Sequence, residues 1–148
     1  MSPIQHESGT RLWLWIPTVL ALEIAKAYSV GMKLLLENLP PSLLDQRETL
    51  ARCLEAMDRV MPLKSVYLFG SHARGEARSD SDVDLCLVAE GATEQLKAAQ
   101  QFRRAISEIR PKPAFSLLPI APQRLSEKQT MGDHFFQTVL REAVKLAA

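Results

Sequence analysis

The spacing of apolar and polar residues changes several times along the chain, and each change marks an expected element. After Pro40, apolar residues recur every three or four positions in three stretches, as they do on one face of a helix. Between these stretches lie short apolar runs rich in residues that favour strands. The pattern therefore predicts helices over residues 42–61, 93–109 and 133–146, strands over 65–69, 83–88 and 114–120, and a polar loop over 70–81.

Capping residues and prolines set the expected ends of these elements. Ser42 and Thr93 are suited to cap the N-termini of the first two helices, and Pro62 ends the first helix. Pro119 has no N–H to donate to a neighbouring strand. The third strand is therefore expected at an edge or at its own end.

The apolar faces of the helices indicate how the elements pack. Leu96 lies on the predicted inward face of the second helix, and Phe135 and Leu146 lie on that of the closing helix. The order helix, strand, loop, strand, helix, strand, helix predicts an α/β (α+β) protein, with a small mixed β-sheet and helices packed on it. We expect one domain over residues 40–148 and an N-terminal extension over residues 1–39.

Three interpretations of the N-terminal extension stay open. One is a helix over about residues 17–38. Another is a signal peptide, with residues 12–22 as its apolar core and Ala25-Lys26-Ala27 as a cleavage pattern. The third is a native start at Met32. The apolar run is too short to span a bilayer, which takes about 20 residues, so no membrane association is expected.

Charge and cysteine content exclude some classes of function. The formal net charge is only +1, whereas a dedicated nucleic-acid binder is usually far more basic, so no direct nucleic-acid partner is expected. Cys53 and Cys86 are far apart and form no Cys/His cluster, so a zinc site has no support. Both are expected to be buried, reduced thiols.

Candidate chemistry gathers in and beside the loop that joins the first two strands. The first strand runs directly into Gly70 and Ser71. Glycine lets a ligand approach the backbone closely, and backbone amides at the start of a helical turn attract anions. This end of the loop is a candidate phosphate site.

Two carboxylates follow at the other end of the loop. Asp82 and Asp84 are two positions apart at the start of a strand, so their side chains are expected on one face and Val83 on the other. Paired carboxylates suit Mg²⁺, which binds one or two of them together with water and substrate phosphates. A calcium loop starting at Asp80 is excluded, because its sixth and twelfth positions hold Leu85 and Gly91, not glycine and glutamate.

The order Gly70-Ser71, ten residues, then Asp82-Val83-Asp84 resembles the signature of the nucleotidyltransferase superfamily with the polymerase-beta-like fold. With Ala73-Arg74-Gly75 and Ser81-Asp82, the loop resembles the minimal nucleotidyltransferase family of small prokaryotic proteins. The resemblance covers roughly residues 50–146. It implies that Gly70 and Ser71 bind the triphosphate and that Asp82 and Asp84 bind the metal and act in catalysis.

The resemblance also implies a donor, a cofactor and a partner. Arg74 and Arg78 are the nearest cations for phosphate, while His72 is expected to be an exposed turn residue. The implied reaction is Mg²⁺-dependent transfer of AMP from ATP to a protein hydroxyl in the cytoplasm. The implied partner is a helical HEPN-type ribonuclease toxin, which this chain would neutralise as an antitoxin, in a hetero-oligomer.

One departure from the family pattern bears on catalysis. Where the family usually has a third carboxylate on the next strand, this chain has Ser116, which cannot serve as a base or an anionic metal ligand. Losing a positioned base typically costs about 10²–10⁴-fold in rate. Glu76 and Asp133 are conceivable substitutes. The alternatives are therefore a weak or inactive antitoxin that acts by binding alone, and a nucleotidyltransferase for a small molecule such as an aminoglycoside.

Overall fold

Four strands form one mixed sheet in the computed structural model, which describes residues 31–148. They are β1 (Leu63–Phe69), β2 (Val83–Ala89), β3 (Phe115–Ile120) and β4 (Val144–Ala147), in the order β3-β2-β1-β4. β1 pairs antiparallel with β2 and β4, whereas β2 and β3 are parallel. A parallel pair needs a crossover connection, which α5 (Gln95–Ala105) supplies.

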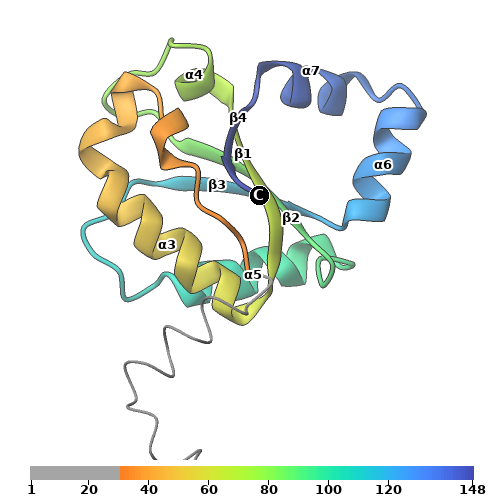
Figure 1. Ribbon diagram of the computed structural model, residues 1–148, viewed down its shortest axis with the longest axis horizontal. Helices are drawn as coiled ribbons and strands as arrows, with labels where there is room; N and C mark the ends of the chain where they lie inside the picture. The colour runs from red at the N-terminus through yellow and green to blue at the C-terminus, as the bar shows by residue number, and fades with distance from the viewer. Residues whose placement is uncertain (1–30) are drawn as a thin grey trace, which may run out of the picture. The chain divides into compact units, whose positions relative to one another are not determined.

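Helices cover both faces of this sheet. Figure 1 shows α3 (Arg47–Val60) and α6 (Pro122–Thr130) on opposite sides of it. Helix α5 packs on the same face of the sheet as α3, and α7 (His134–Glu142) packs on the same face as α6. The remaining helices are short: η1 (Leu36–Asn38), η2 (Pro41–Gln46) and α4 (Gly70–Ala73).

Strand β2 lies in the middle of the hydrophobic core. Val83, Leu85 and Leu87 are fully buried among residues of α3 and α5. Cys86 and Val88 point to the other face and pack with residues of α6 and α7. Because both faces of β2 are covered, its sequence is a continuous apolar run instead of an alternating one. Asp84 interrupts that run on the α6–α7 face.

The elements predicted between residues 42 and 120 are confirmed, with shifted ends. The first helix begins as the 3-10 helix η2 and continues as α3, and the second helix is the shorter α5. All three predicted strands are present. β3 is an edge strand, as Pro119 indicates. Both cysteines are free and buried, as expected.

The prediction of one closing helix over residues 133–146 is wrong. α7 ends at Glu142, and the chain continues as β4, which adds to the sheet beside β1. Leu146 is fully buried, but in a strand. Pairing with β1 outweighs the weak helical preference of Ala143-Val144-Lys145-Leu146, because local propensity decides little once a strand edge is available.

Several finer predictions are also wrong. α6 was not expected, because Leu125 alone is buried along it and it therefore carries little apolar periodicity. Leu96 and Phe135 are 78% and 53% exposed instead of facing the core. Ser42 does not cap the first helix, because it lies within η2, which starts at Pro41.

Residues just before Pro40 pack on the same domain. Leu34 forms a β-bridge with Ala147, and Leu36 and Leu39 are buried in the α3–α5 core. Residues 36–38 form a 3-10 turn in place of the end of the predicted helix, while the predictions for residues 1–30 lie outside the described part. In residues 31–148, each helix is too short or too polar to cross a membrane.

Candidate nucleotide and metal site

The loop between β1 and β2 begins at Gly70, directly after Phe69. Gly70 has a φ of 74°, in the left-handed region that glycine tolerates and other residues rarely adopt. A Cβ at this position would collide with the Asp84 carboxylate oxygen Oδ2. The glycine expected to bind phosphate and the carboxylate expected to bind metal are therefore in direct proximity, although 14 positions separate them in the sequence.

The two aspartates lie at the start of β2. Asp82 is exposed just before the strand, and Asp84 is half-buried one residue into it. Val83 and Leu85 are fully buried on the α3–α5 face. Asp84 shares the opposite face with Cys86, in agreement with the predicted alternation.

The surroundings of Asp84 disfavour its negative charge. Burial raises the pKa of the Asp84 carboxyl above its ordinary value, and the nearby charge of Asp82 raises it further. A hydrogen bond with Ser116 and the charges of His72 and Arg74 lower the pKa but do not offset the rise. A cation between the two carboxylates would relieve their repulsion.

Ser116 lies directly beside Asp84. In the parallel ladder between β2 and β3, Asp84 pairs with Ser116, and the serine side chain is exposed. Ser116 and Leu118 are two residues apart on β3, so they share the face that α6 and α7 cover. The position counted from the sequence as that of the third carboxylate is therefore the neighbour of Asp84, and it holds a hydroxyl.

The two arginines of the loop have different surroundings. Arg74 Nε donates to Glu76 Oε2 at 3.0 Å, and its Nη1 lies 3.7 Å from Glu142 Oε2 at the end of α7. Its charge also reaches Asp84. Arg78 is exposed on the outer part of the loop, where its backbone N–H donates to Ser81 Oγ. Arg74 is thus the loop cation that the structure brings to Asp84.

His72 is buried, so the prediction of an exposed turn residue is wrong. It is 5% exposed, with Nε2 3.4 Å from the Ser81 carbonyl oxygen and Nδ1 2.8 Å from Ser42 Oγ. Because a carbonyl only accepts, Nε2 is the donor in the contact with Ser81, while Nδ1 and the Ser42 hydroxyl share the other hydrogen bond. His72 thereby ties the first half of the loop to its last residue before Asp82.

The conceivable substitute carboxylates have other partners. Asp133 caps α7 by accepting from the backbone N–H of Phe136, and it pairs with Lys128. Glu76 pairs with Arg74. Sequence reasoning missed Ser42 and Glu142 as neighbours of the loop, because 30 and 68 positions separate them from His72 and Arg74 and no local pattern signals such contacts.

The donor set fits a Mg²⁺ ion that is completed by substrate. Within residues 31–148, no cluster of three or more histidine, cysteine, aspartate or glutamate side chains is suited to hold a metal alone. Asp82 and Asp84 are a pair, and Mg²⁺ commonly takes one or two carboxylates and fills its other positions with water and phosphate oxygens. Burial and the neighbouring charge of Asp82 raise the pKa of Asp84, so a cation bound between the two carboxylates would favour the charged form of Asp84.

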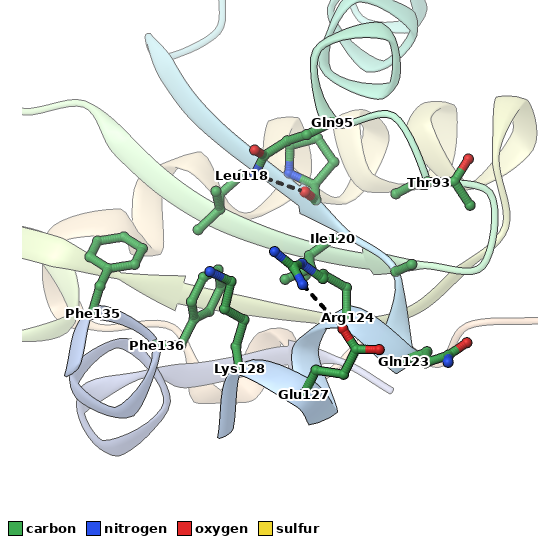
Figure 2. A pocket seen from close by; sticks show the side chains of 13 residues that line it. Thr93, Gln95, Leu118, Ile120, Gln123, Arg124, Glu127, Lys128, Phe135 and Phe136 are labelled. Carbon is green, nitrogen blue, oxygen red and sulfur yellow. Dashed lines mark hydrogen bonds and ion pairs between the residues drawn. The ribbon is translucent and has the colours of Figure 1, made fainter. Parts of the chain in front are cut away.

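Two sizeable cavities flank this site. One, of about 580 Å³, lies between β3, α6 and α7 and is shown in Figure 2. The other, of about 500 Å³, lies behind the loop, between η2 and Ala114. Neither is lined by Gly70 or Asp84. The site is therefore located by its carboxylates and glycine, since phosphate and metal bind to backbone and oxygen ligands without needing an enclosed cavity.

Comparisons with known proteins agree with this arrangement. The sequence profile described as "Nucleotidyltransferase domain" matches residues 48–131, more than half of the chain, and that stretch contains Gly70, Ser71, Asp82 and Asp84. No curated protein matches the chain significantly. The fold is similar to the crystal structure of a presumed nucleotidyltransferase from Sulfolobus solfataricus, at 22% identity and a TM-score of 0.43, over 58% of this chain and 76% of that one.

The match to the family profile shows the α/β class with the nucleotidyltransferase fold and the general activity of nucleotidyl transfer. The chain belongs to the nucleotidyltransferase domain family.

Proposed function

We propose that this chain transfers AMP from ATP, with Mg²⁺, to a hydroxyl of a partner protein, and that the partner is a HEPN-type toxin which the transfer inactivates. The observation that carries the proposal is the proximity of Gly70 to the Asp84 carboxylate. This proximity places the backbone at Gly70, where we propose that phosphate binds, next to the carboxylate pair. The choice of ATP and of a protein acceptor rests on the resemblance of the loop to the minimal nucleotidyltransferase family.

The proposed roles follow from these positions. Gly70 and Ser71 bind the triphosphate, while Asp82 and Asp84 hold Mg²⁺, which when bound would neutralise charge on the phosphates. Arg74 exchanges its contacts with Glu76 and Glu142 for a phosphate oxygen. Arg78, on the exposed part of the same loop, is a second candidate for phosphate contact.

The reaction is a displacement at the α-phosphorus of ATP. The acceptor oxygen forms a bond to that phosphorus, and the bond from the α-phosphorus to the oxygen that bridges to the β-phosphorus breaks. Pyrophosphate leaves, and the hydroxyl proton passes to solvent. With Ser116 beside Asp84, this chain offers no third carboxylate at that position to take the proton. We therefore expect slow turnover.

The test uses two labels. Purified chain, partner and Mg²⁺ are incubated with ATP labelled either at the α- or at the γ-phosphorus. Nucleotidyl transfer labels the partner from the α-position only, whereas phosphoryl transfer labels it from the γ-position. Asp82→Ala with Asp84→Ala abolishes the label, and Asp80→Ala, an exposed carboxylate of the same loop, keeps it. The proposal is wrong if the wild-type chain binds no nucleotide at millimolar concentration.

A second candidate function is neutralisation by binding alone. Ser116 favours it, because the hydroxyl beside Asp84 replaces a group that would activate the acceptor. In that case the double alanine variant still suppresses the ribonuclease activity of the partner, and neither ATP position labels it. Loss of suppression by a variant that still binds the partner would rule this candidate out. A cytoplasmic location stays a prediction under both candidates.

A further inference from the structure

The larger cavity has a mixed chemical character. Figure 2 shows Phe135 and Phe136 of α7 on one side, Arg124 and Lys128 of α6 on another, and Leu118 of β3 on the sheet side. We call it the α6–α7 cavity. Its volume of about 580 Å³ lies within the range of small-molecule sites, about 300–1,000 Å³.

The cavity lies on the same face of the sheet as the carboxylates. Leu118 is two residues beyond Ser116 on β3, which is about 7 Å at the rise of a parallel strand, and Ser116 pairs with Asp84. On the other side, the ring of Phe135 lies 6.3 Å from that of Phe69, the residue before Gly70. The cavity therefore borders the phosphate site on two sides, through Leu118 and through Phe135.

The charges around the cavity favour a neutral group over a further anion. Its two lining cations are already paired, Lys128 with Asp133 at 3.2 Å and Arg124 with Glu127 at 3.1 Å. The carboxylates of Glu127 and Asp133 offset these two positive charges, so they reduce the attraction of the cavity for a further anion. A neutral ring system does not depend on that attraction.

Phe135 offers a surface for a flat ring. It is 53% exposed, although it contacts two other aromatic rings edge-on, Phe69 at 6.3 Å and Phe136 at 5.3 Å. These contacts hold the ring at the cavity. Nucleobases stack on such rings regardless of base identity. Thr93 and Gln123 add polar groups for the edge of a base.

We infer that the α6–α7 cavity receives the base of the nucleoside triphosphate whose phosphates lie at Gly70 and Asp84, with Phe135 as its stacking partner. This inference rests on the proposed function, because it needs the triphosphate at the loop.

The experiment compares two ligands on the full chain with Mg²⁺, ATP and inorganic tripolyphosphate, by calorimetry. Tripolyphosphate contacts the loop but has no base. Phe135→Ala weakens ATP binding about 5- to 100-fold and leaves tripolyphosphate binding unchanged. Phe135→Tyr retains the affinity for ATP, because it keeps the ring. Leu96→Ala, at a 78% exposed apolar residue of α5, changes neither affinity.

The outcomes separate the two claims. If the wild type binds neither ligand, the proposed function fails. If the wild type binds ATP and Phe135→Ala leaves that affinity unchanged, or weakens both ligands equally, the base cavity is wrong. If Phe135→Ala fails to fold, NMR on the wild type with bound ATP replaces it. Magnetisation transfer between the adenine protons and the Phe135 ring supports the inference, and its absence overturns it.

Discussion

Asp84 and Ser116 are direct partners in the parallel ladder between β2 and β3. Ser116, the position at which the resemblance predicts a third carboxylate, is therefore in register with Asp84. A single substitution can supply that group.

We expect Ser116→Asp to raise the rate of nucleotidyl transfer. The new carboxylate would stand beside Asp84 and could take the proton of the acceptor, a contribution on the order of 10²–10⁴-fold. The rate of label transfer from α-labelled ATP measures it. Ser116→Asn, with similar size and no charge, is the control, and equal rates for the two variants would contradict the prediction.

We expect Asp84→Asn to raise the melting temperature by a few degrees at pH 7 in the presence of a chelator. Because the pKa of Asp84 is raised in the folded chain, the folded chain binds more protons than the unfolded chain just above the ordinary pKa. The free energy of unfolding therefore falls as pH rises through this window and stays lowered above it. The asparagine amide in Asp84→Asn carries no charge, so the variant does not lose this part of the free energy of unfolding.

The matched control is Asp80→Asn, at an exposed carboxylate of the same loop, which should leave the melting temperature unchanged. Added Mg²⁺ should stabilise the wild type and not Asp84→Asn, because a ligand stabilises only the chain that binds it. A variant less stable than the wild type under chelation would show that the carboxylate is already compensated.

Gly70→Ala should destabilise the fold more than Gly75→Ala does. Both glycines have a φ near 73°, so both substitutions carry the strain of the left-handed region, about 1–2 kcal/mol. A Cβ at Gly70 would also collide with Asp84, whereas a Cβ at Gly75 has no neighbour within 4 Å. Urea unfolding measures the free energy of unfolding of both variants, and the difference between them is the cost of the collision. Equal losses of free energy would disprove the proximity of Gly70 and Asp84.

Ser42→Ala should lower the free energy of unfolding by about 1–3 kcal/mol, because it leaves the buried Nδ1 of His72 without its hydrogen-bond partner. Denaturant unfolding measures the change. Ser79→Ala, at an exposed serine of the loop, serves as the comparison and should cost little. An equally small effect at both serines would mean that the Ser42 contact contributes nothing.

The strand, loop and strand around the candidate site could be predicted from the sequence because their patterns are local. The spacing from Gly70 to Asp84 predicts a turn followed by a strand, and the alternation at Asp82 and Asp84 follows from strand geometry alone. Counting along the third strand singled out Ser116, and the parallel register places that residue opposite Asp84.

The remaining errors concern contacts between distant segments. His72 is polar and lies two residues after Gly70, which locally indicates an exposed turn, yet it is buried and contacts Ser42 of η2. Val144 and Leu146 have helical neighbours in sequence, and only the free edge of β1 makes them a strand. Such contacts depend on where the other elements pack, which no short window of sequence contains.

Pro119 has a consequence for how partners approach. It has no N–H, and its carbonyl already accepts from Gln95 Nε2 at 3.1 Å. An incoming strand that docked along β3 would find no N–H donor at this residue and a carbonyl that Gln95 already contacts, which disfavours pairing there. We therefore expect a protein acceptor, if the proposed function is right, to present its hydroxyl from a loop or a helix and not from a strand that pairs with β3 at Pro119.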